Sequence, residues 1–187
     1  MVSMKPVTLI AGPGRSGTTF LWLLLKELGF DTGDDPEYFH HKKREALKGN
    51  FPYVIKGTAG LCHNFPEYVE RFNLEVDYVI VALRNLESNV KSKAKARKRD
   101  GAARYRNRTT EDIRNELRER IPLCVGRLML HLFEGEHPHT VVMFPRSAQD
   151  VDYCYAKITG AMGWIPYDTF VEAWNKVVQP ELIRNEV

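Results

Sequence analysis

Eight residues near the start of the chain, Gly12-Pro-Gly-Arg-Ser-Gly-Thr-Thr19, combine a glycine-rich turn with three hydroxyl side chains. Glycines let backbone N–H groups turn inward around an anion, and the hydroxyl groups add further donors. A helix that starts directly after such a turn presents its positive N-terminal end to the same anion. The segment therefore predicts a phosphate-binding loop, with these binding residues: Gly14, Arg15, Ser16, Gly17, Thr18 and Thr19.

The charged residues of this loop differ from those of a nucleoside-triphosphate-binding loop. Thr18 stands where such a loop has the lysine that reaches the β- and γ-phosphates. The cation is Arg15, inside the loop, and the strongest central strand ends at Arg84 rather than at a magnesium-binding aspartate. We expect no metal, since the His, Cys and Asp residues show no ligand spacing. A P-loop nucleotide or small-molecule kinase is an alternative hypothesis against which these differences count.

The elements that must position the loop follow from apolar runs and turn residues. Apolar runs predict four strands, at residues 7–11, 53–56, 78–83 and 140–144. Helical spacing and capping residues predict helices from 18 or 19 to 28, from 86 into a basic stretch, from 109 or 110 to 132, at 152–162 and at 167–178. Pro122 is expected to kink the third of these helices. The pattern predicts one domain, 1–187, of the α/β class: a P-loop-type, three-layer α/β/α fold with a central, mostly parallel sheet.

Positive charge is concentrated in one stretch, residues 91–108, which we call the basic strip. It holds nine of the 27 basic residues and a single acid, Asp100, so it carries +8 while the rest of the chain carries −5. This distribution indicates a local anionic partner rather than a nucleic-acid coat. Three interpretations are open: a solvated helix face, a contact to an anionic nucleotide or acceptor, and nucleic-acid binding. The last is disfavoured, because Tyr105 is the one aromatic residue in the strip.

The sequence resembles the sulfotransferase family in two motifs. Pro13-Gly-Arg-Ser-Gly-Thr-Thr19 resembles the family's 5′-phosphosulfate loop, in which Lys or Arg precedes SGTT. Arg84-Asn-Leu-Glu-Ser-Asn-Val-Lys-Ser92 resembles the second motif, an Arg at a strand end with a Ser eight residues later. The segment from Ala156 to Pro166 is also similar to the family's late helix end. The resemblance implies that Arg84 and Ser92 bind the 3′-phosphate of the donor, 3′-phosphoadenosine 5′-phosphosulfate (PAPS).

The same resemblance implies a transfer of sulfonate to a hydroxyl or amine, with adenosine 3′,5′-bisphosphate as the nucleotide product. Arg15 and Lys56 would stabilise the charge that develops on the leaving phosphate and the sulfonate. Glu37, followed by two aromatic residues as in carbohydrate and tyrosyl members, is the first choice of general base. Three histidines compete with it because imidazole titrates near neutral pH: His40, His41 and His63.

The chain also departs from the family. Leu86 replaces the usual proline after Arg-Asn, no residues after Trp164 match the late Arg-Lys-Gly loop, and the catalytic histidine after Lys-Thr is missing near Lys56. The expected acceptor is a small molecule, a carbohydrate or a tyrosyl group, anionic acceptors included. A further alternative is a catalytically inactive module that binds polyanions.

Two features bear on location. The three cysteines, Cys62, Cys124 and Cys154, are widely spaced and predict reduced structural thiols. No run reaches the roughly 18 apolar residues of a membrane span, and no leader pattern is present, so we expect a cytoplasmic protein without a membrane span.

Overall fold

Four parallel strands form the sheet of the computed structural model, which describes residues 6–37, 49–57, 59–99, 105 and 107–178. The strands are β1 (Pro6–Ala11), β2 (Val54–Lys56), β3 (Glu75–Arg84) and β4 (His139–Phe144), and their order in the sheet is β2-β1-β3-β4. All three pairings are parallel. The predicted strands are therefore confirmed, and β3 extends further toward its N-terminus than its apolar run.

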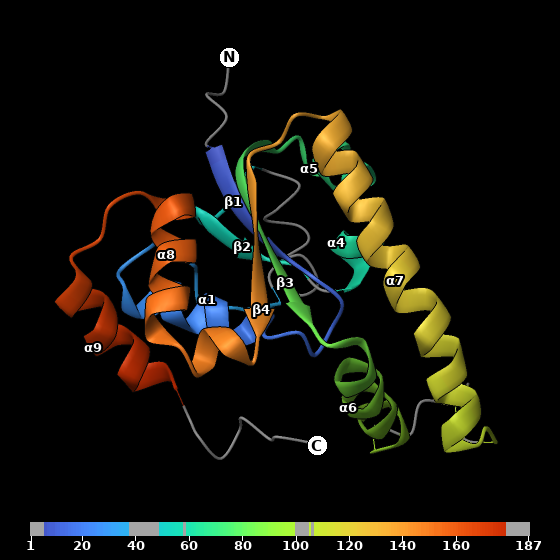
Figure 1. Ribbon diagram of the computed structural model, residues 1–187. Helices are drawn as coiled ribbons and strands as arrows, with labels where there is room; N and C mark the ends of the chain where they lie inside the picture. The colour runs from blue at the N-terminus through green and yellow to red at the C-terminus, as the bar shows by residue number, and fades with distance from the viewer. Residues whose placement is uncertain (1–5, 38–48, 58, 100–104, 106, 179–187) are drawn as a thin grey trace.

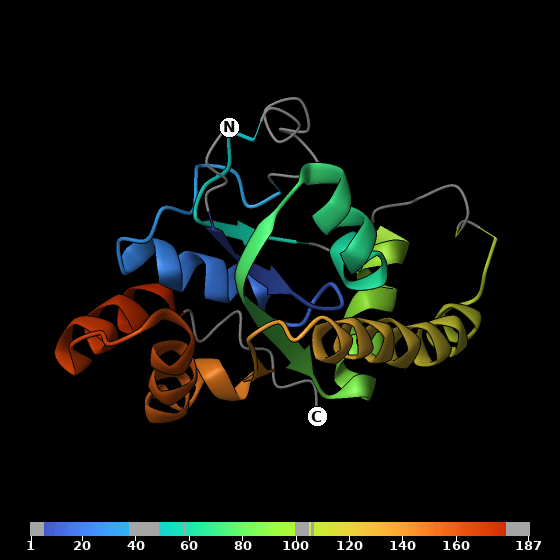
Figure 2. The ribbon, with the colours of Figure 1, turned by 90° about the horizontal axis from the view of Figure 1, so that it is seen from above.

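Helices cover both faces of the sheet. One face carries α1 (Thr18–Glu27), α8 (Val151–Met162) and α9 (Tyr167–Val177), and the other carries α4 (Ala59–His63), α5 (Phe65–Phe72) and α7 (Thr110–Glu134). Figure 2 shows the sheet between these two groups of helices. The α/β class is confirmed, and the described elements form three layers around a wholly parallel sheet.

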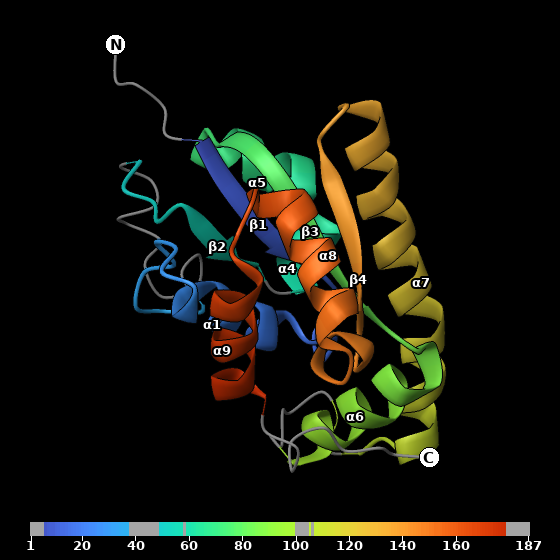
Figure 3. The ribbon, with the colours of Figure 1, turned by 60° about the vertical axis from the view of Figure 1, so that its left-hand side comes forward.

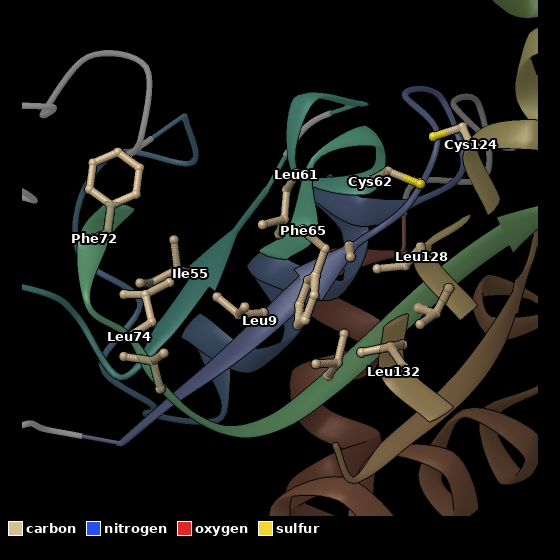
Figure 4. Close-up of a cluster of buried hydrophobic side chains, with 14 residues drawn as sticks. Leu9, Ile55, Leu61, Cys62, Phe65, Phe72, Leu74, Cys124, Leu128 and Leu132 are labelled. Carbon is tan, nitrogen blue, oxygen red and sulfur yellow. The ribbon is translucent and has the colours of Figure 1, made fainter. Parts of the chain in front are cut away.

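The alternation of side chains along the strands explains the two layers. In β1, Leu9 contributes to the core under α4, α5 and α7, whereas its neighbour Ile10 contributes to the core under α1, α8 and α9. In β3, Val79 and Ile80 divide between the same two cores. Figure 4 shows the first of these cores. Because both faces are covered, the central strands read as continuous apolar runs.

The helix α6 (Leu86–Arg99) begins where β3 ends and packs against the first half of α7 (Figures 1 and 3). A separate apolar cluster joins the two helices, with Val90 and Ala94 from α6 and Ile113 and Leu117 from α7. Thr109 starts α7 with a reciprocal capping box, in which its side chain and that of Asp112 each bind the other's backbone N–H. The helix continues through Pro122 as one element of 25 residues.

The sequence did not predict α4, α5 or the short 3-10 helix η2 (Arg146–Ala148). The segment between α1 and β2 holds no helix or strand at 29–37 or 49–52, the parts of it that the structure describes. Among the described helices, none is both long and apolar enough to cross a membrane.

The order of the strands identifies where a ligand would bind. From β1 the chain passes through α1 to β2 on one side, whereas β3 pairs with β1 on the other side. In open parallel sheets, ligands bind beyond the carboxyl ends of the strands at such a reversal of direction. The glycine-rich loop after β1 lies at this point.

Candidate functional site

The loop between β1 and α1 depends on two glycines that no larger residue could replace. A Cβ on Gly12 would lie 2.4 Å from the carbonyl oxygen of Ala82 and 2.8 Å from Oγ of Ser16. Gly17 has a φ of 94°, and a Cβ there would lie 2.7 Å from the ring of Phe144. The glycines thus let the loop pass close to β3 and to the end of β4.

The start of α1 can receive an anion. Gly17 is the N-cap residue and provides no side-chain cap, so the first backbone N–H groups of the helix keep their donor capacity. The hydroxyl of Ser16 is fully buried inside the loop and has no hydrogen-bond partner among the described residues. A buried donor in this state is expected to be satisfied by a ligand or by water. Of the two predicted starts of the helix, Thr18 and Thr19, the structure has Thr18.

Arg15 connects the loop to α6. Its Nε donates a hydrogen bond of 3.3 Å to Oγ of Ser92, 77 residues further along the chain. The guanidinium side chain is exposed, and the backbone of Arg15 has a φ of 73°, which is unfavourable for a residue other than glycine. The two predicted motifs therefore meet directly at this pair.

Lys56 and Glu37 meet on the other side of the loop. Lys56 is the last residue of β2 and only 5% of its side chain is exposed, and its Nζ lies 2.5 Å from Oε1 of Glu37. The same Nζ lies 3.4 Å from Oγ1 of Thr19 in the first turn of α1. The backbone N–H of Glu37 donates to the carboxylate of Asp35, which fixes the turn that carries Glu37. A candidate cation and a candidate base, 19 residues apart, thus form one ion pair at the loop.

Arg84 and Phe144 lie side by side at the ends of neighbouring strands. The register of β3 and β4 pairs these two residues, and the guanidinium carbon of Arg84 lies 5.6 Å from the centre of the Phe144 ring. The ring of Phe20, in the first turn of α1, is 6.5 Å from that of Phe144. The sequence analysis missed Phe144 as a site residue. Its place at the end of a strand was the signal that could have identified it.

The basic strip divides into two parts in the structure. Its first turn, with Ser92 and Lys93, lies beside the loop. Further along, Arg97 and Arg108 both form ion pairs with Glu116 of α7. This second part of the strip joins α6 to α7, an interpretation that the sequence analysis did not consider. Asp100, Arg104 and Arg106 lie outside the described residues.

The histidines proposed as alternative bases differ in position. His40 and His41 lie outside the described residues. His63 ends α4, and its pKa is lowered, first by burial and then by the positive charges of Arg120, Lys93 and Arg127. The imidazole is therefore neutral at pH 7 and can accept a proton.

The three cysteines are buried free thiols, as the sequence predicted. Cys62 of α4 and Cys124 of α7 point toward each other in the core (Figure 4). A hydrogen bond to Cys124, together with burial, raises the pKa of Cys62. Burial raises the pKa of Cys154 to about 12. In the described part of the chain, no three His, Cys, Asp or Glu side chains cluster as metal ligands would.

Compared with known proteins, the chain matches no protein-family model, no curated protein and no solved structure.

Proposed function

We propose that this chain is a P-loop-type sulfotransferase, which transfers a sulfonate group from PAPS to a hydroxyl or amine of an acceptor. The observation that supports this most is the hydrogen bond between Arg15 and Ser92. These residues come from the two motifs that resemble the family, and they meet beside a loop suited to bind an anion. We also propose a cytoplasmic location, which is supported by the sequence alone.

The loop fits the 5′ end of such a donor. The buried hydroxyl of Ser16 and the uncapped N-terminus of α1 offer several donors to one anionic group. Arg15 adds a permanent positive charge. Thr18 provides a hydroxyl but no cation, which favours a phosphosulfate over the longer and more highly charged triphosphate.

The 3′-phosphate would bind on the side of the loop formed by β3 and α6. Arg84 and Ser92 are the residues that the resemblance assigns to it, and both lie at the carboxyl end of the sheet. Oγ of Ser92 can still donate its own hydrogen, because it acts as the acceptor in the contact with Arg15. The ring of Phe144 lies next to Arg84 and offers an apolar surface to the rest of the nucleotide.

The ion pair of Lys56 and Glu37 supplies the groups for the transfer step. In an in-line displacement, a bond forms between the acceptor oxygen or nitrogen and sulfur, while the bond from sulfur to the bridging oxygen breaks. Glu37 takes the acceptor's proton, and Lys56 and Arg15 stabilise the negative charge on the sulfonate and the departing phosphate. Lys56 also holds the Glu37 carboxylate beside the start of α1.

A transfer assay tests this proposal. The purified chain is incubated with sulfur-labelled PAPS, EDTA and a panel of acceptors: phenols, amines, neutral sugars, sulfated glycans and tyrosyl peptides. We expect labelled product with at least one acceptor class and no requirement for magnesium. If adenosine 3′,5′-bisphosphate binds but no label leaves the donor, the inactive polyanion-binding module becomes the better account. If transfer is found only in a parallel incubation with labelled ATP and magnesium, without EDTA, the chain is a kinase.

A further inference from the structure

Lys93 differs from the other lysines at the start of the basic strip. Lys91 and Lys95 are exposed, whereas the side chain of Lys93 is half-buried and turns toward the loop after β1. Its Nζ lies 3.9 Å from the position that a Cβ on Gly14 would occupy. The ammonium group is therefore next to the backbone of the phosphate-binding loop, on the side that faces α6.

The described part of the chain provides no carboxylate partner for this ammonium group. Among the described residues, no carboxylate lies within ion-pair distance of Lys93. The charges of Arg97 and Arg120 disfavour the charged form of this ammonium, whereas the thiols of Cys62 and Cys124 act in the opposite direction. Burial, followed by the charge of Arg97, lowers the pKa of Lys93. A half-buried ammonium without a carboxylate partner is unfavourable, and an added anion would stabilise it.

Other cations nearby already have partners. Arg97 and Arg120 both form ion pairs with Glu116, and Arg15 contacts Ser92. Lys93 is thus the cation next to the loop whose surroundings favour an added anion most clearly. The buried, unsatisfied hydroxyl of Ser16 indicates independently that the loop receives a ligand with hydrogen-bond acceptors.

We infer that Lys93 binds the 5′-phosphate end of the nucleotide, together with Arg15 and the backbone of the loop. This inference rests on the proposed function, because it takes that site's donor as the source of the anion. It adds a binding residue that lies outside both motifs: Lys93 directly follows Ser92 but contacts the opposite end of the nucleotide. The two neighbours on α6 would then bind the two phosphates of one molecule.

Binding of three nucleotides tests this inference by calorimetry in EDTA. Adenosine 3′,5′-bisphosphate carries both phosphates. Adenosine 5′-monophosphate carries only the 5′-phosphate, which we assign to Lys93, and adenosine 3′-monophosphate carries only the 3′-phosphate. For Lys93→Met we expect affinity for the first two to fall about 10- to 100-fold, as for loss of a hydrogen bond to a charged group. Affinity for the 3′-monophosphate should change less than about twofold. Lys93→Arg should retain most of the affinity, and Lys95→Met is the matched control.

The stability of the free protein separates ligand binding from a structural role. When no nucleotide is bound, no carboxylate of the described residues neutralises Lys93. The free Lys93→Met protein should therefore melt at the same temperature as the wild type or at a higher one. If Lys93→Met melts at a lower temperature and loses affinity equally for all three nucleotides, Lys93 supports the fold. That result would overturn the inference.

The remaining outcomes separate this inference from the proposed function. If Lys93→Met binds adenosine 3′,5′-bisphosphate as Lys95→Met does, the inference is wrong, although the proposed function still stands. If the wild type binds none of the three nucleotides, both are wrong.

Discussion

Lys56 Nζ lies 2.5 Å from Glu37 Oε1 and 3.4 Å from Thr19 Oγ1, so one buried ammonium joins an irregular segment to the first turn of α1. The contact is possible because β2 pairs with β1 and therefore ends beside the loop that follows β1. It holds a carboxylate where an acceptor would approach a group bound by that loop. The same geometry makes the role of Glu37 as a general base testable.

Glu37→Gln should lower kcat about 10²- to 10⁴-fold, the range expected for loss of a general base. The affinity for adenosine 3′,5′-bisphosphate should change less than about twofold, since Glu37 is not assigned to the nucleotide. Initial rates of label transfer to the best acceptor measure the effect. Glu70→Gln, at an exposed position on α5, is the control. A loss below tenfold would reject Glu37 as the base and leave His40, His41 and His63 as candidates.

Arg15→Gly should separate activity from stability. Arg15 has a φ of 73°, which glycine adopts readily, so we expect the melting temperature of the free protein to stay the same or rise. The rate of transfer should fall about 10²- to 10³-fold because one donor to the developing charge is lost. Arg15→Lys retains a cation and should keep part of the rate. Equal rates in Arg15→Gly and the wild type would contradict the role of Arg15.

Gly17→Ala should destabilise the protein by about 2 to 4 kcal/mol, because it adds both steric overlap with Phe144 and an unfavourable positive φ. Urea denaturation measures the change. Gly126→Ala is the matched control: nothing lies within 4 Å of a Cβ there, and the residue is inside α7. That change should stabilise the protein by about 0.5 to 1 kcal/mol. If the two variants had equal stability, the close approach of the loop to β4 would be wrong.

His63 should make the protein less stable in mild acid. Its pKa in the folded state is lowered from 6.5 by burial and by Arg120, Lys93 and Arg127, so the unfolded chain binds more protons below that pH. The free energy of unfolding is therefore highest above pH 6.5 and falls as the pH drops from 6.5 toward the folded-state pKa. In His63→Asn, the free energy of unfolding should fall less than in the wild type between pH 7.5 and about 5. Urea denaturation at each pH measures this difference. A wild-type pH profile in His63→Asn would contradict the lowered pKa.

The elements around the loop could be predicted because their signals are local. The apolar run before Gly12, the hydroxyls after it and the capping threonine before α7 act on residues close to them in the chain. The helices α4 and α5 were missed because they are only five and eight residues long, although Phe65, Val69 and Phe72 follow the i, i+4, i+7 spacing of a helix face. Tertiary packing, rather than local preference, stabilises such helices.

Most residues of the candidate site could be predicted from the sequence, but the contacts between them could not. The motifs identified Arg15, Ser92 and Lys56, yet only the strand order brings Lys56 to Glu37 and Arg15 to Ser92. Lys93 was counted in the basic strip without distinction from Lys91. Its burial beside Gly14 follows from how α6 packs against α7, and no sequence pattern reports that.

The most direct test of the central claim is thermal melting with adenosine 3′,5′-bisphosphate in EDTA, compared with ATP and magnesium. At a ligand concentration 100 times its Kd, we expect the melting temperature to rise by about 5 to 10 °C. Magnesium ATP should give no comparable rise, and Arg84→Ala should abolish the shift with the bisphosphate. Stabilisation by magnesium ATP alone would contradict the proposal that this chain is a sulfotransferase.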